Sequence, residues 1–189
     1  MIQQQTQAVT IGASAGALEA LLTVLPQLPE TFPAPIFIVV HLPPDKNSMV
    51  AELLGGRCQL TVTEAQDKEL SQPGHVYIAP PDYHLLVEAD GSMSLSSDEP
   101  VHYSRPSIDV LFESAADAYG DGLVGVVLTG ANDDGASGLK LIAEYGGRAL
   151  VQDPAEASAS AMPKAALTHC PKAEKLSLDG IANYLNRLT

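Results

Sequence analysis

Short apolar runs and helically spaced apolar residues alternate along the first forty residues. Residues 8–11 form a strand-like run that meets a turn of small residues at 12–16. Residues 36–40 form a continuous apolar run, Ile-Phe-Ile-Val-Val, as parallel strands buried on both faces require. The pattern predicts a strand, a helix that ends at Pro26 and a second parallel strand, which together make a βαβ unit. The apolar face of that helix consists of Ala17, Leu18, Leu21, Leu22 and Leu25.

The same alternation continues along the rest of the chain. Helical spacing from Ser107 to Gly120 precedes an apolar strand at 123–129. A further helix follows the loop 130–135 and ends at Gly146-Gly147. Two short runs flank Asp90-Gly91, a dipeptide that favours the tight turn of a β-hairpin. The other expected elements are a helix at 49–54, strands at 60–64, 75–79 and 149–151, a loop at 155–161, and a last helix capped by Asp179.

These elements define a fold class. Strands that alternate with helices predict an α/β protein with a doubly wound, largely parallel sheet, helices on both faces and a small antiparallel hairpin. A length of 189 residues is enough for one domain with a substantial core. We therefore expect residues 1–189 to form a single domain.

Composition narrows the class of function. The chain carries 10 Lys and Arg against 23 Asp and Glu, a net charge of −13, so its field repels phosphate backbones and anionic lipids. Nucleic acid is therefore not an expected partner, and no apolar stretch approaches the roughly 20 residues needed for membrane insertion. The first residues lack the basic start of a secretory signal, and Cys58 and Cys170 form no ligand pattern. We expect a cytoplasmic protein without a structural metal.

Ser14 is the first candidate for chemistry, because it lies in Gly12-x-Ser14-x-Gly16 between the first strand and the first helix. Small residues there allow the sharp turn of a nucleophile elbow, which exposes a serine hydroxyl at a helix N-terminus. A plain turn with Ser14 as the helix N-cap explains the same residues equally well. A dinucleotide site is a third explanation, but it requires G-x-G-x-x-G and an acidic residue where the second strand ends in His41.

His41 and one of two aspartates could complete a hydrolytic site with Ser14. His41 ends the second strand, before Pro43-Pro44, and in open α/β sheets the binding crevice lies beyond the carboxyl ends of the strands. Asp133 and Asp134 follow a later strand whose end faces the same crevice. A serine becomes nucleophilic when an imidazole takes its proton and an acid orients the imidazole. Spacing does not choose between the aspartates, and an ordinary Asn/Asp/Gly turn also explains both.

Five separated blocks of the sequence, in order, resemble the catalytic domain of the chemoreceptor protein-glutamate methylesterases, the CheB type. The resemblance runs from about residue 9 to residue 188 and includes Gln-Asp at 152–153 and Met-Pro at 162–163. The blocks are I-G-A-S-A-G at 11–16, V-V-H-L-P at 39–43, V-Y-I-A-P-P at 76–81, R-P-S-I-D-V-L-F at 105–112 and V-V-L-T-G-x-x-x-D-G-A at 126–136.

The resemblance implies a role for one residue in each of three blocks. The serine of the first block is the family's nucleophile, the histidine of the second its base, and the aspartate before Gly-Ala in the fifth orients the base. These positions are Ser14, His41 and Asp134 in this chain. Backbone N–H groups at Ala15 and near Ala131 are candidate donors to the oxyanion. The resemblance implies no cofactor and no metal.

The implied reaction is hydrolysis of glutamate γ-methyl esters on the cytoplasmic helical bundle of methyl-accepting chemotaxis receptors, often accompanied by glutamine deamidation. Many relatives carry Thr after the nucleophile, Gly-Gly at 16–17 and Met-Gly at 131–132, where this chain has Ala15, Gly16-Ala17 and Ala131-Asn132. A noncatalytic module that docks on receptors or signalling partners is therefore the alternative. The residues before the first strand leave no room for the family's receiver domain. We therefore expect either that the chain is an excised domain, or that the natural protein is controlled by a separate response regulator in trans or is not controlled at all.

Overall fold

A parallel sheet forms the centre of the fold in the computed structural model, which describes residues 6–41 and 49–188. Within those residues the strand order is β3-β4-β2-β1-β7-β8-β9, and every pairing is parallel. β1 lies centrally, between β2 and β7, as a buried apolar strand should. The strands are β1 (Ala8–Ala13), β2 (Ile36–Val40), β3 (Thr61–Glu64), β4 (His75–Ile78), β7 (Leu123–Val127), β8 (Arg148–Gln152) and β9 (Glu174–Leu176).

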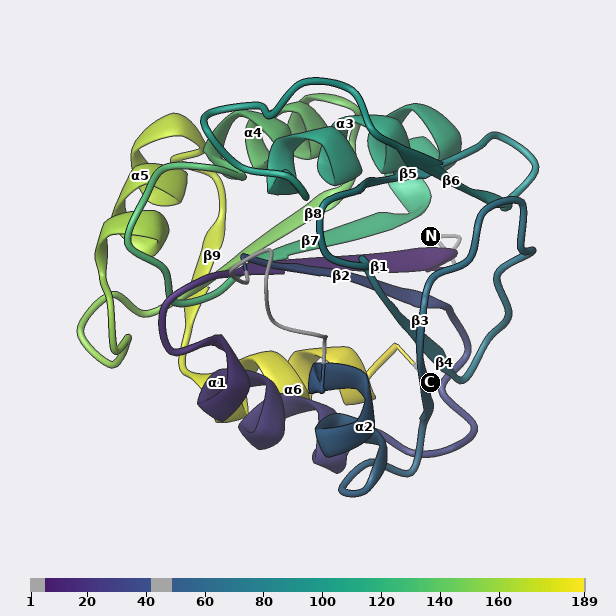
Figure 1. Ribbon diagram of the computed structural model, residues 1–189. Coiled ribbons are helices and arrows are strands. Elements are labelled where there is room, and N and C mark those ends of the chain that lie inside the picture. The colour runs from purple at the N-terminus through teal and green to yellow at the C-terminus, as the bar shows by residue number, and fades with distance from the viewer. Residues whose placement is uncertain (1–5, 42–48, 189) are drawn as a thin grey trace.

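Helices cover both faces of this sheet (Figure 1). α1 (Ala17–Val24), α2 (Val50–Gly55) and α6 (Leu178–Asn186) lie on one face, and α3 (Ile108–Tyr119), α4 (Ala136–Glu144) and α5 (Ala161–His169) lie on the other. Short 3₁₀ turns follow α1 at Leu25–Gln27 and α3 at Gly120–Gly122. The predicted doubly wound, largely parallel sheet is confirmed. Within the described residues, no helix combines the length and the apolar character that a membrane span requires.

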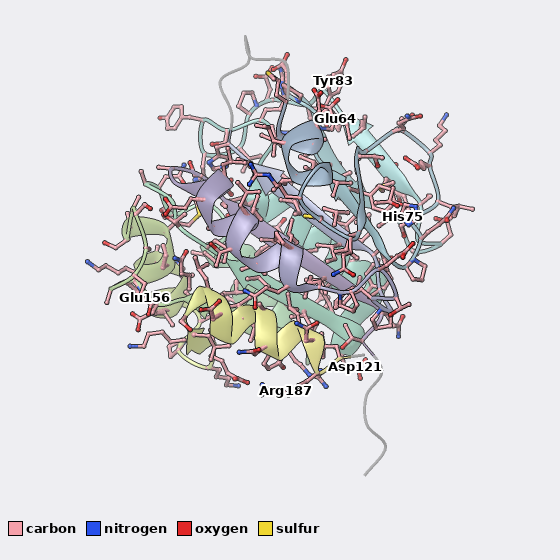
Figure 2. All side chains as sticks on the ribbon, turned by 90° about the horizontal axis from the view of Figure 1, so that it is seen from below. Glu64, His75, Tyr83, Asp121, Glu156 and Arg187 are labelled. Atoms are coloured by element: carbon pink, nitrogen blue, oxygen red, sulfur yellow. The ribbon has the colours of Figure 1, made fainter. Side chains whose placement is uncertain are left out.

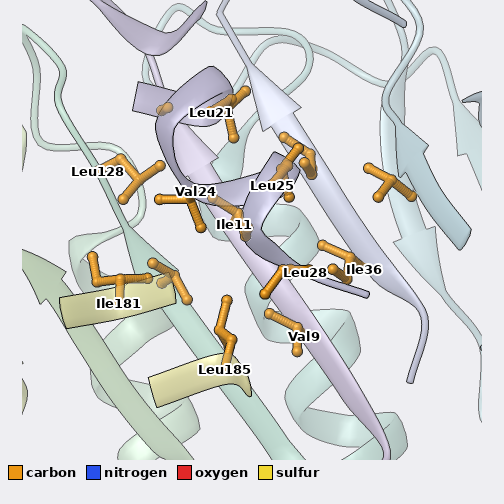
Figure 3. Packing of buried hydrophobic residues seen from close by; sticks show 14 of the residues in the cluster. Val9, Ile11, Leu21, Val24, Leu25, Leu28, Ile36, Leu128, Ile181 and Leu185 are labelled. Atoms are coloured by element: carbon orange, nitrogen blue, oxygen red, sulfur yellow. The ribbon is translucent and has the colours of Figure 1, made fainter. Parts of the chain in front are cut away.

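The core consists of two apolar layers, one on each face of the sheet. On the first, Val9 and Ile11 of β1 pack against the buried sides of α1 and α6, which include Val24 and Leu185 (Figure 3). Successive residues of a strand point to opposite faces of the sheet. The apolar strand residues that point away from α1 and α6 therefore belong to the other layer, beneath α3 and α4. A view onto the first face shows α1 and α6 side by side, with Glu156 and Arg187 at the rim of the molecule (Figure 2).

The predicted hairpin is also present. β5 (His84–Val87) and β6 (Met93–Ser96) pair antiparallel around Asp90-Gly91. The N–H of Val87 donates to the Ser114 hydroxyl at 3.1 Å, which ties the hairpin to α3. The hairpin therefore extends the layer that contains α3.

The structure corrects the prediction at the C-terminal end of the chain. Ser177, rather than Asp179, is the N-cap of α6, because Ser177 has the extended backbone of a cap and its hydroxyl accepts the Gly180 N–H at 3.0 Å. Asp179 lies in the first turn and accepts from the Gln27 side chain at 3.0 Å. α5 and β9 were not predicted. The strand stop predicted at Pro43-Pro44 lies outside the described residues.

Candidate active site

Strand register brings Ser14 and His41 side by side. β1 pairs Ala13 with Val40 of β2, so Ser14 and His41 are the next residues along the two strands. The His41 N–H still donates to the Ala13 carbonyl at 3.2 Å, which continues the ladder by one residue. Neighbouring strands are about 4.8 Å apart. Both residues therefore leave the sheet at the same edge, as the sequence predicted.

The turn after Ser14 is sharp because of Gly16. Gly16 has φ +82° and is the N-cap of α1, so the explanation of Ser14 as that cap is wrong. A Cβ on Gly16 would lie 2.8 Å from the Ser158 Cβ, closer than side chains pack. The Thr129 hydroxyl donates to the Ala15 carbonyl at 2.8 Å and thereby fixes the turn from the neighbouring strand end. Ser14 itself is half-buried and has no left-handed backbone strain.

Asp134 is the most firmly held residue of the site. It lies in the loop before α4, and only 1% of its surface is exposed. Its Oδ2 accepts the Ile108 N–H at 2.7 Å, and its Oδ1 accepts the Asp109 N–H at 2.9 Å and the Ser107 hydroxyl at 3.0 Å. The carboxylate thus sits against the N-terminus of α3, where unpaired N–H groups favour negative charge.

These donors keep Asp134 ionised in spite of its burial. Burial is the largest single effect and would raise the pKa of the carboxyl group. The hydrogen bonds from His41 and from the Asp109 and Ile108 N–H groups outweigh burial and lower the pKa of Asp134. Asp134 is therefore an acceptor for every group that faces it.

The imidazole of His41 has a partner on each ring nitrogen. Its Nε2 lies 2.7 Å from Oδ2 of Asp134, and its Nδ1 lies 3.3 Å from Nδ2 of Asn132. Because a carboxylate only accepts, Nε2 carries the proton and Nδ1 presents its lone pair. Nδ1 is therefore the ring nitrogen that can act as a base. Within the described residues, no hydrogen bond joins the Ser14 hydroxyl to His41.

The structure distinguishes Asp133 from Asp134, which the spacing of the sequence could not do, because the two side chains have different surroundings. Asp134 is buried against His41, whereas Asp133 is exposed and its carbonyl accepts the Ala136 N–H at 3.2 Å. Asp134 is thus the partner of the imidazole. Within residues 6–41 and 49–188, no three His, Cys, Asp or Glu side chains gather closely enough to hold a metal ion.

A pocket of about 440 Å³ opens beside Ser14 and His41. Its walls come from the end of β2, the first turns of α1 and the start of α2, and they are mostly apolar. Ala15 and Ala131, the predicted oxyanion donors, are exposed but do not line this pocket. In the described part of the chain, neither backbone N–H donates a hydrogen bond to another group of the protein. The remaining lining residues include Leu18, Glu19, Val40 and Val50.

Sequence analysis missed the residues that support the acid. Ser107 donates to Asp134, and its own N–H donates to Nδ1 of His84 at 3.1 Å. His84 is buried, and its Nε2 reaches the Glu99 carbonyl at 3.1 Å, so its role is structural. The conspicuous block at 105–112 was the available signal, although its sequence does not say what it contacts. Asn132 gave no signal beyond its place next to the aspartates.

The fold and site define an α/β enzyme domain with its polar residues at the carboxyl ends of a parallel sheet. The chain belongs to the CheB methylesterase family, whose sequence profile matches residues 9–185. The structure is similar to the crystal structure of the Thermotoga maritima CheB methylesterase catalytic domain, with a TM-score of 0.92 and 34% identity, over 98% of this chain and 100% of that chain. These matches confirm the predicted family and fold.

Relatives of different lengths share this domain. A Leptospira interrogans protein, provisionally named a protein-glutamate methylesterase/protein-glutamine glutaminase, is 48% identical over 96% of this chain and 94% of its own length. Proteins of that name from Archaeoglobus fulgidus and Salmonella typhi are 39% and 38% identical over 84% and 94% of this chain. The chain spans 46% and 51% of the lengths of those two. The relatives are hydrolases by name, which confirms the prediction of an enzyme.

Proposed function

We propose that this chain hydrolyses glutamate γ-methyl esters on the cytoplasmic helical bundle of methyl-accepting chemoreceptors, with Ser14 as nucleophile, His41 as general base and Asp134 as the residue that orients the base. The observation that carries the proposal is the 2.7 Å contact between His41 Nε2 and buried Asp134, at a strand end next in register to Ser14. The names of the relatives support the ester and amide substrates.

Acylation begins when Nδ1 of His41 takes the proton of the Ser14 hydroxyl. The Ser14 oxygen forms a bond to the ester carbonyl carbon, and the carbonyl oxygen becomes an oxyanion. Meanwhile Nε2–H stays bonded to Asp134, whose negative charge stabilises the imidazolium. When the intermediate collapses, the bond to the methoxy oxygen breaks and that oxygen takes the proton from Nδ1, so methanol leaves.

Deacylation runs the same proton path in reverse. Nδ1 takes a proton from water, the hydroxide oxygen attacks the acyl carbon, and the Ser14 oxygen leaves with the proton from Nδ1. The products are a free glutamate carboxyl group and the restored serine. A glutamine side chain would follow the same steps and release ammonia. The N–H groups of Ala15 and Ala131 are the proposed oxyanion donors, because both are exposed and neither donates to another described group.

Substitution of the nucleophile gives the decisive test. Ser14→Ala is expected to abolish methanol release from methylated receptor membranes, measured with and without a phosphorylated response regulator. Wild-type protein should also react with a fluorophosphonate probe at Ser14, and the Ser14→Ala variant should not. Ser158→Ala is a suitable control, because Ser158 is near the same turn but has no role in the proposed chemistry.

A noncatalytic docking module is the second candidate, favoured by the absence of a Ser14–His41 hydrogen bond in the described residues. The same experiment separates the two. A docking module would bind receptor membranes while Ser14 stayed unlabelled, and Ser14→Ala would leave that binding unchanged. Full methanol release by Ser14→Ala would contradict the serine mechanism.

A further inference from the structure

The side chain of Asn132 contacts the one ring nitrogen that the proposed mechanism needs as a base. Its Nδ2 lies 3.3 Å from Nδ1 of His41, and its Oδ1 accepts the Asp134 N–H at 3.2 Å. Because the oxygen of the Asn132 amide accepts from the Asp134 N–H, the nitrogen of the same amide must be the atom that faces the imidazole. The amide is therefore a donor to Nδ1, which agrees with the protonated Nε2 on the side of Asp134.

We propose that Asn132 is a positioning residue that occupies the Nδ1 lone pair of His41 in the resting enzyme and must release it before Ser14 can be deprotonated. This inference rests on the proposed function of Ser14 and His41. Asn132 and Ser14 compete for a single acceptor, because the other ring nitrogen is committed to Asp134. The absence of a Ser14–His41 hydrogen bond among the described residues is then the expected resting state.

Chemistry and the Asn132 contact exclude each other. Once Nδ1 has taken the Ser14 proton it becomes a donor, and it would then face the two N–H groups of the Asn132 amide. The amide must therefore turn away, or the ring must move, at the acylation step and again at deacylation. The enzyme reacts only from the fraction of molecules in which Nδ1 is free, so its apparent rate is the rate of the free form multiplied by that fraction.

The contact has the properties of a reversible latch. Asn132 is exposed, so its amide can exchange His41 for water, and 3.3 Å is long for a hydrogen bond. A neutral hydrogen bond of this kind shifts an equilibrium by about threefold to tenfold. Asn132 also holds the loop through the Asp134 N–H, so the test must separate the effect on the base from the effect on loop shape.

Two substitutions at Asn132 make that separation, with Asp133→Asn as the matched control on the adjacent exposed residue. Asn132→Gly removes the donor and should raise both kcat for methylated receptor and the rate of fluorophosphonate labelling by about threefold to tenfold, with KM unchanged. Asn132→Asp keeps an oxygen for the Asp134 N–H but places a carboxylate beside Nδ1, which favours a protonated ring. Both rates should fall below those of wild type.

A role in loop shape alone predicts the reverse order, with Asn132→Asp close to wild type and Asn132→Gly impaired. That result, or equal rates in all the variants, would overturn the inference. The Nδ1 signal of His41 in ¹⁵N spectra of the whole chain reports the contact without turnover, and it should move downfield in Asn132→Gly only. If the probe does not label Ser14 of the wild-type protein, the proposed function is wrong. If Ser14 is labelled but the Nδ1 signal is unchanged in Asn132→Gly, the inference about Asn132 alone is wrong.

Discussion

The two sides of the His41 ring are built differently. On the Asp134 side, a buried carboxylate accepts the Ser107 hydroxyl and the Ile108 and Asp109 N–H groups in addition to His41. On the Ser14 side, the half-buried nucleophile lies in the turn after β1, and the Nδ1 contact comes from exposed Asn132. The comparison shows that the groups that stabilise the imidazolium are fixed in advance on the buried Asp134 side, where water does not weaken them. The contacts on the Ser14 side, which receives the substrate, can still change.

The largest expected effect comes from breaking the buried side. Asp134→Asn replaces an acceptor by a group with one oxygen and one donor, so the Nε2–H tautomer of His41 loses its support. We expect the proposed esterase activity to fall by about 10⁴-fold, measured as methanol release. Asp133→Asn, one residue away and exposed, should retain activity.

Equal losses in the two variants would show that the loop, rather than the buried carboxylate, is what activity needs. A folded Asp134→Asn protein with near wild-type turnover would remove Asp134 from the mechanism. Thermal unfolding of both variants provides the necessary check, because Asp134 also holds the N-terminus of α3.

A smaller loss of activity should follow when Asp134 loses only one of its hydrogen-bond donors. Ser107 caps α3 through the Val110 N–H and also donates to Asp134, whereas Ser177 caps α6 with no contact to the site. Ser177→Ala should lower the free energy of unfolding by about 1 kcal/mol, and Ser107→Ala should lower it by more, because Asp134 also loses a donor. Only Ser107→Ala should lower turnover as well, by about tenfold, since a hydrogen bond to a charged group is lost.

The pair of serine variants separates stability from catalysis by urea unfolding and methanol release on the same samples. If Ser177→Ala lowered turnover as much as Ser107→Ala, the loss would come from general destabilisation. If Ser107→Ala kept full turnover, the hydroxyl would contribute only a helix cap.

Periodicity and strand ends predicted the parts of the site that depend on local sequence. The apolar run 36–40 and the Gly-rich turn after residues 8–11 were enough to place Ser14 and His41 at one edge of the sheet. The parallel sheet, its covering helices and the hairpin followed from the same patterns. Each element has a local signature in its own residues, in the spacing of its apolar positions and in the residues that end it, which is why a single sequence predicts it.

Features that leave no distinctive pattern in residue type were not predictable in this way. Asp134 is oriented by N–H groups of α3, about 26 residues earlier in the chain, and a backbone donor leaves no trace in residue type. α5 was not predicted because the Ala- and Ser-rich residues that lead into it do not show a clear helical spacing of apolar side chains. Asp179 was taken as a cap because Asp and Ser serve that role almost equally well, and only the backbone conformation distinguishes Ser177.

The smallest predicted effect concerns Asp109, a second carboxyl group on the buried side. Burial raises the pKa of Asp109 from 3.8 to about 6; the Gly138 N–H opposes this rise, and the negative charge of Asp134 adds to it. The folded state therefore binds this proton more tightly than the unfolded chain does. Its contribution to stability is complete below about pH 4 and is lost as pH rises through 6.

Asp109→Asn removes this titration while keeping an oxygen for the Gly138 N–H, which Oδ1 of Asp109 accepts at 2.7 Å. Urea unfolding between pH 4 and 7.5 should show the variant gaining stability relative to wild type as pH rises through about 6, with little further change above pH 7. Asp134 does not interfere in this window, because its lowered pKa places its loss of stability at more acidic pH. Asp117→Asn, on the exposed side of α3, is the matched control and should follow wild type throughout. A constant difference in the free energy of unfolding between Asp109→Asn and wild type across this pH range would contradict the prediction. It would mean that burial beside Asp134 does not raise the pKa of Asp109.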